Sequence, residues 1–174
     1  MIPGDYSVVL TAGGKSFTQP LAVKMDPRVK MSNADLARQL DLSKKLYETR
    51  AVLQPIGKSY ESVAAEIAKA KEKAGDNPVK EQIEALTKKL QELADPARVR
   101  AGQPLQLDVL GKVETLFRAI QEADAAPTSQ AEAAATAVQD DARKVRERWG
   151  AMPQEVAALN SGLEAAGIEK IKFP

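Results

Sequence analysis

Residues 60–93 read YESVAAEIAKAKEKAGDNPVKEQIEALTKKLQEL. Its first half carries apolar or small residues at alternating spacings of three and four: Tyr60, Val63, Ile67, Ala70 and Ala74. After the turn GDNP the pattern returns in Val79, Ile83, Leu86, Leu90 and Leu93. Two narrow apolar stripes joined by a short turn are typical of antiparallel helices with coiled-coil-like packing. The sequence therefore predicts a helical hairpin, with Asn77 as a cap and Pro78 at the first helical position.

The first helix of this pair extends toward the N-terminus. Ser32 followed by Asp35 is an acidic form of the capping box, so we expect the helix to begin near Asn33. At about 100° per residue one wide stripe continues along it. Its members are Leu36, Leu40, Ser43, Leu46, Tyr47 and Leu53. Pro55 removes the hydrogen bond to the carbonyl of residue 51, so we expect a kink or a break there.

This first helix is too long for the second helix to cover. Over some forty residues, at about 1.5 Å each, it would be about 60 Å long if it were continuous. Either the third and fourth helices cover its first half, or the chain folds back at Pro55. The sequence leaves both alternatives open.

The remaining chain predicts three more helices. A long connection, ADPARVRAGQP, leads to a third helix that ends near Asp124 and is marked by Val109, Val113, Leu116, Phe117 and Ile120. Thr128 or Ser129 caps an alanine-rich fourth helix, in which one face holds Ala134, Ala137, Val138, Val145 and Trp149. Gly150 ends that helix, and Pro153 opens a short fifth helix through Val156, Leu159 and Leu163. Gly167 is the natural stop of this last helix.

Residues 5–24 predict a β-hairpin before the helices. Tyr6, Val8 and Leu10 alternate with Ser7, Val9 and Thr11, and Phe17, Leu21 and Val23 follow the pair Gly13-Gly14. Two alternating runs joined by a glycine pair are a strong hairpin signal. Pro20 cannot donate to a strand ladder, so the second strand lies at an edge or carries a bulge there. Because a lone hairpin is marginal in water, it must pack on the helices, a partner chain or a missing β domain.

The predicted fold class is therefore mainly α. It is an up-and-down bundle of four to five helices over residues 31–174, with the first helix long and kinked at Pro55, preceded by a hairpin over residues 1–30. The chain begins abruptly, almost inside a strand, so we expect it to be a piece of a longer protein.

Composition removes whole classes of chemistry. The 174 residues include neither cysteine nor histidine, which excludes thiolate nucleophiles, disulfides, the usual general base and the commonest transition-metal ligands. The net charge of +1 gives no electrostatic reason to expect nucleic acid or an anionic membrane as partner. No apolar run is long enough to span a bilayer, and the N-terminus MIPGDYSVVL does not have the pattern of a signal peptide.

Two tripeptides match the end of a phosphate-binding loop, Gly14-Lys15-Ser16 and Gly57-Lys58-Ser59. The full motif needs a further glycine five residues before the second one, between a strand and a helix. Those positions are Val9 and Val52. The sequence therefore predicts no nucleotide site and no cofactor.

The paired acids Asp140 and Asp141 are the most obvious catalytic candidates. A glycosidase needs two carboxyl groups facing each other across a cleft, about 5–10 Å apart. Adjacent helical residues point about 100° apart, so these two cannot line one cleft. We expect Asp141 near the apolar face, either as the partner of a lysine or arginine or as a residue at the edge of that face. We assign no catalytic, cofactor-binding or metal-binding residue, and the loop AGDN lacks the ligand spacing of a calcium site.

The aromatic and basic residues favour structural roles in the same way. Trp149 could stack on a sugar or a partner, but its place on the inner face predicts a core residue. The two tyrosines on either side of Pro55, Tyr47 and Tyr60, are also predicted to be in the core. The run from Arg143 to Trp149 carries four basic residues, and the acids Asp140, Asp141 and Glu147 lie beside or within it, which indicates a solvated face of mixed charge.

Most of the chain resembles the C-terminal end of large exported bacterial proteins with BNR-repeat or sortilin-like propellers, which are labelled glycosyl hydrolases. In these, the propellers precede an immunoglobulin-like β domain and a helical tail. The resemblance rests on four segments: PGDYSVVLTAGGKSFTQPLAVKMDPRV (3–29), DLARQLDLSKKLYE (35–48), ADAAPTSQ (123–130) and RWGAMPQEVAALNSGLEAAGI (148–168). It implies that residues 1–30 are a remnant or edge of the β domain and that the propellers, with any active site, are missing.

The resemblance also implies a function and a location. It implies an exported, periplasmic or extracellular protein in which this region is a non-catalytic structural or protein-interaction module. The partner would be the neighbouring propeller or immunoglobulin-like domain, or a second copy of the chain. Two alternatives stay open: a glycoside hydrolase fragment, which predicts a pocket with facing carboxylates, and an intracellular (cytoplasmic) helical adaptor. The module predicts an exposed apolar patch on the hairpin or on the kinked helix.

Overall fold

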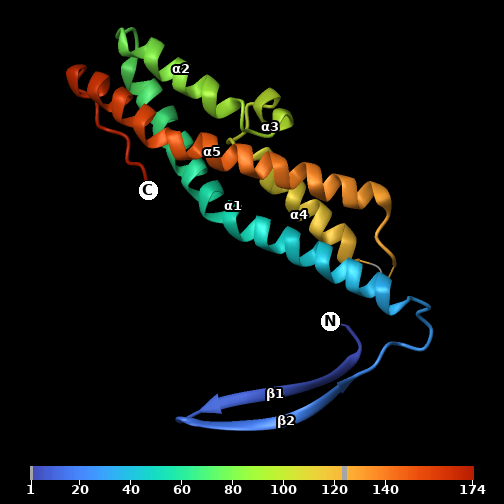
Figure 1. Cartoon of the computed structure of the whole chain (residues 1–174). Helices are drawn as coiled ribbons and strands as arrows, with labels where there is room; N and C mark the ends of the chain where they lie inside the picture. The colour runs from blue at the N-terminus through green and yellow to red at the C-terminus, as the bar shows by residue number, and fades with distance from the viewer. Residues whose placement is uncertain (1, 123–124) are drawn as a thin grey trace.

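The computed structural model describes residues 2–122 and 125–174, which form two strands and five helices. The fold class predicted from the sequence, a mainly α bundle with an N-terminal hairpin, is confirmed (Figure 1). In chain order the elements are β1 (Gly4–Ala12), β2 (Lys15–Val23), α1 (Asn33–Ala74), α2 (Val79–Gln91), α3 (Pro96–Arg100), α4 (Asp108–Gln121) and α5 (Ser129–Ala165).

The two long helices, α1 and α5, run in the same direction. Arg38 near the start of α1 pairs with Glu132 near the start of α5, at 2.7 Å. Lys73 at the other end of α1 lies 3.5 Å from Glu169, just beyond α5. Figure 1 shows the same arrangement, with the two helices side by side along the bundle.

A third rod, made of α2 followed by α4, runs antiparallel to both long helices. The Tyr60 hydroxyl donates a hydrogen bond to the Leu90 carbonyl of α2, at 2.8 Å. Gln39, near the start of α1, donates to the Ile120 carbonyl at the end of α4, at 2.7 Å. Thus α2 covers the second half of α1 and α4 covers its first half. Of the two alternatives left open by the sequence, later helices cover the first half of α1, and the chain does not fold back at Pro55.

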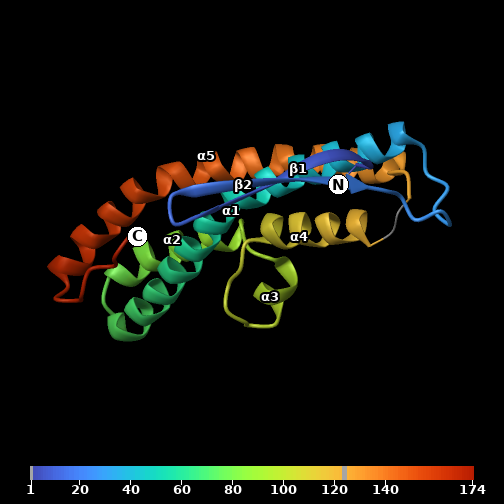
Figure 2. The ribbon, with the colours of Figure 1, turned by 90° about the horizontal axis from the view of Figure 1, so that it is seen from below.

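Both long helices pass through a proline. Pro55 lies inside α1 and Pro153 inside α5. The expected break at Pro55 does not occur, and in Figure 2 α1 and α5 both change direction partway along. The predicted end of the fourth helix at Gly150 and the separate fifth helix are wrong. A proline removes one backbone donor, but Trp149, Met152 and Val156 keep a single buried face on both sides of it, and that packing holds the helix together.

The apolar stripes form one continuous core. In α1 the buried positions are Leu36, Leu42, Leu46, Leu53, Gly57, Tyr60, Val63, Ile67, Ala70 and Ala74. The predicted stripe of the first half is therefore corrected. Leu42 takes the central place, Leu40 and Ser43 are half-buried, and Tyr47 is 58% exposed. Tyr47 lies one position, about 100°, past Leu46, which turns it to the outer edge of α4 beside Phe117.

The core faces of α2 and α5 show one agreement and one correction. All five predicted positions of the second helix are buried, from Val79 to Leu93. In α5, Val138, Val145 and Trp149 are buried as predicted, whereas Ala134 and Ala137 are exposed. Their places are taken by Ala135 and Ala142, which are buried.

The helix ends follow the local signals in the sequence. The Ser32 hydroxyl accepts a hydrogen bond from the Asp35 amide at 3.1 Å, and Thr128 caps α5 in the same way through Ala131. Asn77 accepts from the amide of Val79, at 3.0 Å. The third predicted helix, α4, ends at Gln121, and the predicted end at residue 124 lies outside the described residues.

The long connection between α2 and α4 contains α3, and backbone hydrogen bonds join its two ends. The Asp95 carboxylate caps α3 by accepting from the Ala97 amide, at 2.8 Å. The Asp95 amide donates to the Gln106 carbonyl, and the Asp108 amide donates to the Leu93 carbonyl. These bonds join the end of α2 directly to the start of α4, so the third rod continues past the loop.

After α5 the chain folds back along the bundle. The Asn160 side chain holds the backbone of Ile171 at both its N–H and its carbonyl, at 2.7 and 2.9 Å. Ile171 is buried, and the ring centroids of Phe173 and Trp149 are 5.3 Å apart. The tail therefore seals the end of the core.

Candidate interaction surface

The hairpin turn is set by Gly13 and Gly14, whose φ values are 58° and 75°. Positive φ at both central residues defines a two-residue type I′ turn, which matches the twist of the flanking strands. It joins Ala12 to Lys15, and the pairing continues without interruption to Gly4 and Val23. The predicted hairpin is present with the predicted turn.

The register places the large apolar side chains on one face. Tyr6 pairs with Leu21 and Leu10 pairs with Phe17. Because side chains alternate along a strand, these four share a face with Val8. We call this the apolar face: Tyr6, Val8, Leu10, Phe17 and Leu21. The opposite face carries mostly short or polar residues, including Ser7, Thr11, Ser16 and Thr18.

The apolar face is open to solvent. Its side chains are between 38% and 62% exposed, with Leu10 the most exposed. In the described part of the chain, six of the eight large exposed apolar residues belong to the hairpin. Figure 1 shows the hairpin standing away from the helices. We therefore find the exposed apolar patch that an interaction module predicts.

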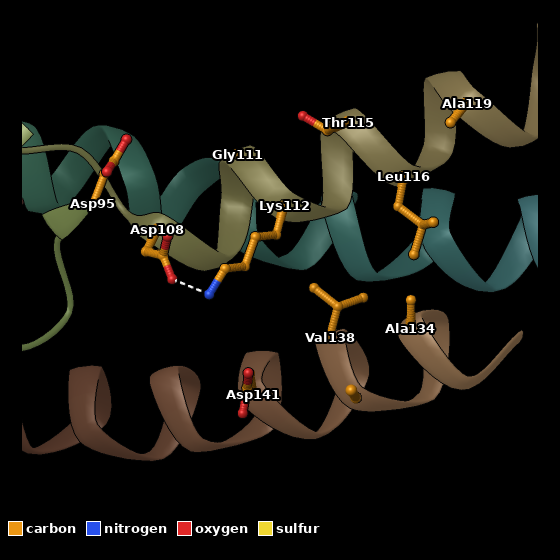
Figure 3. Close-up of a pocket in the computed structure, with 11 residues that line it drawn as sticks. Asp95, Asp108, Gly111, Lys112, Thr115, Leu116, Ala119, Ala134, Val138 and Asp141 are labelled. Carbon is orange, nitrogen blue, oxygen red and sulfur yellow. Dashed lines mark ion pairs between the residues drawn. The ribbon is translucent and has the colours of Figure 1, made fainter. Parts of the chain in front are cut away.

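A hollow of about 690 Å³ lies between α4 and α5. Small residues on both helices open it: Gly111, Ala119, Ala134 and Ala137. Leu116 and Val138 form its apolar part, as Figure 3 shows. We call it the α4–α5 groove.

One end of the α4–α5 groove carries charge. Asp108 and Lys112 form an ion pair on α4, and Asp141 approaches from α5 (Figure 3). The hydrogen bond that Lys112 donates to Asp108 raises the pKa of Lys112, and the charges of Asp108, Asp141 and Asp95 raise it further. The lysine is therefore held in its charged form. It can attract an anionic group, but it cannot act as a base near neutral pH.

The carboxylates of this groove all have structural partners. Asp108 binds Lys112, Asp141 binds Lys144 at 3.1 Å, and Asp95 caps α3. In glycosidases the general acid is a carboxyl group buried against apolar side chains. Among the described residues no charged side chain is buried. The groove thus brings acids together without the environment that acid catalysis requires.

The sequence candidates are distributed as follows. Asp140 pairs with Arg143 and faces a different hollow from Asp141, as the helical geometry predicts. Trp149 and Tyr60 are core residues, as predicted, with ring centroids 5.8 Å apart. Tyr47 was predicted to be in the core, and that prediction is wrong. The basic run after Asp141 is exposed, and its first members pair with acids one turn earlier.

The two Gly-Lys-Ser tripeptides lie in unrelated settings. Gly14 belongs to the hairpin turn, and Gly57 lies in the middle of α1. A Cβ added to Gly57 would stand 2.9 Å from a Leu110 methyl group, so this glycine lets α4 approach α1 closely. Neither tripeptide joins a strand to a helix, which a phosphate loop requires.

The sequence did not single out Asp95, Asp108 or Lys112. They come from two elements joined by an irregular loop, so nothing in their order shows that they meet. The one readable signal is the spacing of four between Asp108 and Lys112, which is that of a helical ion pair.

Comparison with protein-family models, curated proteins and solved structures finds no match to this chain. Within residues 2–122 and 125–174, no group of three potential ligand side chains is placed to hold a metal ion. No helix in the same ranges combines the length and the apolar character needed to cross a bilayer.

Proposed function

We propose that this chain is a non-catalytic structural or protein-interaction module that docks through the apolar face of its hairpin onto a neighbouring β domain. The observation that carries the proposal is the exposure of Tyr6, Val8, Leu10, Phe17 and Leu21 on one side of an isolated hairpin. Two strands alone are marginal in water, and they become stable when a further layer covers their apolar side.

The size of the apolar face supports docking. With 38–62% of each side chain exposed, its five residues present roughly 400–600 Å² of apolar surface, taking usual side-chain areas. That is the upper end of what a typical monomer exposes, and patches of this size often mark interaction sites. The α4–α5 groove offers less apolar surface, and its charged groups already have partners.

The resemblance described above supplies a setting for this module. In that setting it is the C-terminal accessory region of a larger exported propeller protein, and the neighbour is its propeller or immunoglobulin-like domain. The alternative partner is a second copy of this chain. The balanced net charge supports a protein partner over nucleic acid.

A glycoside hydrolase fragment is the second candidate function. It is favoured by one observation, that Asp108 and Asp141 face the α4–α5 groove from different helices. Both acids are paired with lysines and are partly exposed, which argues against a catalytic role. The exposed hairpin therefore supports docking more strongly than the groove supports hydrolysis. Hydrolysis of glycan substrates that Asp141→Asn abolishes would establish this alternative.

Site-specific photo-crosslinking tests the docking proposal. A benzophenone amino acid is placed at Leu10 on the apolar face or, as a matched control, at Thr18 on the opposite face, in the full-length protein in its native cells. We expect Leu10 to cross-link to a strand residue of a β domain, identified by mass spectrometry of the joined peptides, and Thr18 to give little product. Cross-links from Thr18 alone, or none from Leu10, would contradict the proposal.

A further inference from the structure

The two edges of the hairpin differ in their ability to pair. The register from Gly4 to Val23 contains no bulge, so of the two predictions for Pro20, edge strand or bulge, the edge is the one that remains. In a type I′ hairpin the residues flanking the turn exchange hydrogen bonds, and the pairs then alternate between bonded and non-bonded. Ser7 and Pro20 fall on a non-bonded pair. Pro20 therefore directs its nitrogen outward.

This placement closes the outer edge of β2. A strand added there would need an N–H from position 20, and proline has none. The outer edge of β1 has no such gap. By the same alternation, Asp5, Ser7, Val9 and Thr11 direct their N–H and carbonyl groups outward, and none of them is proline. A run of unpaired backbone groups on an exposed strand is a template for another strand.

We propose that β1 accepts a strand of a separate β-sheet domain on its outer edge, and that the second layer of that domain covers the apolar face. In the resulting sheet β1 is an inner strand and β2 the terminal one. The inference rests on the proposed function and adds the mode of binding, which is strand addition. The added strand carries apolar residues on the side of Leu10 and polar residues on the side of Val9.

A second copy of the chain is a poorer occupant. Two β1 edges could pair, but the four-stranded sheet so formed would leave both apolar faces uncovered on one side. Two apolar faces could instead pack together, which would leave both β1 edges open. That face-to-face contact would bury roughly 800–1,200 Å² in total, at or below the lower limit of stable interfaces. Only a two-layered partner satisfies the edge and the face together.

Strand addition can be measured with a peptide probe. The probe is a capped peptide of alternating Thr and Val with a Lys at each end, added at millimolar concentration to the ¹⁵N-labelled full chain. We expect amide chemical-shift changes at Asp5, Ser7, Val9 and Thr11. The outward amides of β2, at Ser16, Thr18 and Ala22, should stay unchanged.

A pair of proline variants provides the control. Val9 and Thr18 face each other at a non-bonded pair, so Val9→Pro closes the β1 edge while Thr18→Pro changes an edge that is already closed. Pro20 shows that the hairpin tolerates proline at such positions. We expect Val9→Pro to weaken peptide binding by about five-fold, the loss of about one net hydrogen bond. Thr18→Pro should bind like the parent chain. Cross-strand signals between Tyr6 and Leu21 verify that each variant keeps its hairpin.

Three results would overturn the inference. These are shift changes at the β2 edge, unchanged binding by Val9→Pro in an intact hairpin, or no binding by the parent chain. A concentration-dependent dimer that Val9→Pro abolishes would replace the separate domain with a second copy. If the Leu10 cross-link to a β domain stands while the peptide result fails, docking survives and only strand addition is lost. If the Leu10 cross-link fails, the proposed function itself is lost.

Discussion

Leu53 in α1 and Leu10 in β1 are the same side chain in two opposite settings. Leu53 is fully buried between the helices of the bundle, whereas Leu10 is 62% exposed on the hairpin. Both belong to regular apolar patterns, one with the period of a helix and one with the period of a strand. The difference lies in what each element finds to pack against. The helices find one another, and the hairpin finds no second layer in the described part of the chain.

The two regions differ in the source of their stability. The core of the bundle is complete within the chain, down to the tail residue Ile171 that seals its end. The apolar face of the hairpin is exposed, and under the proposed function a partner would bury it. A regular apolar pattern therefore predicts that a face will be buried, but it does not say by which molecule.

The largest contrast is expected from truncating the two leucines. Leu53→Ala removes buried methyl groups and leaves a cavity, which costs about 2–5 kcal/mol of unfolding free energy. Leu10→Ala removes surface already in contact with water, so the helical unfolding transition should change by about 0.5 kcal/mol or less. Urea denaturation followed by circular dichroism at 222 nm measures both. A comparable loss from Leu10→Ala would mean that the hairpin packs on the bundle, and would contradict the contrast between the two regions.

A smaller contrast concerns three glycines that become alanine. At Gly150 in α5 no atom stands within 4 Å of an added Cβ, so the better helix propensity of alanine should stabilise the bundle by about 0.5–1 kcal/mol. At Gly57 the same gain is opposed by overpacking against Leu110, which costs about 1–3 kcal/mol. At Gly13 space is free but φ is positive, so alanine strains the turn and not the bundle.

Thermal unfolding followed by helical signal, with hairpin amide signals recorded in parallel, separates the three effects. We expect Gly57→Ala to be at least about 1 kcal/mol less stable than Gly150→Ala, and Gly13→Ala to alter only the hairpin signals. Equal stability of the two helical variants would show that α1 and α4 do not depend on the close approach at Gly57.

Much of the fold could be predicted because local signals act over a few residues. Ser32 and Thr128 cap helices, and Gly13 and Gly14 turn the hairpin, each through contacts with near neighbours in the chain. Predictions failed where distant packing outweighed the local signal. Gly150 and Pro153 look like a helix end, yet α5 continues because its buried face is intact on both sides.

The interaction surface was predictable in part. Alternation in the sequence identified the residues of the apolar face and the special place of Pro20. It could not tell whether the helices would cover that face, because this depends on the direction in which the connection after β2 leads the chain. The α4–α5 groove was not predictable, since its exposed alanines were expected in the core. Which side of an alanine-rich helix is buried depends on its neighbours.

The smallest contrast is expected from two tyrosines that make the same hydrogen bond in the two regions. Tyr60 donates to the Leu90 carbonyl inside the bundle, and Tyr6 donates to the Ile2 carbonyl on the exposed hairpin, at 2.8 and 2.6 Å. Tyr60→Phe leaves a buried carbonyl without its donor, so we expect a loss of about 1 kcal/mol in unfolding free energy. Tyr6→Phe should leave the helical transition unchanged, because water replaces the lost partner.

Alkaline pH extends this last test. Burial raises the pKa of Tyr60, because the charged phenolate is poorly solvated inside the bundle. In the unfolded chain the Tyr60 hydroxyl ionises near pH 10. Its contribution to the unfolding free energy is therefore complete below that pH and is lost as the pH rises above it. Between about pH 10 and 11 the parent chain should therefore lose more unfolding free energy than Tyr60→Phe does. Parallel slopes for the parent and Tyr60→Phe would show that water reaches Tyr60, and the bundle would then be less closed than its contrast with the hairpin requires.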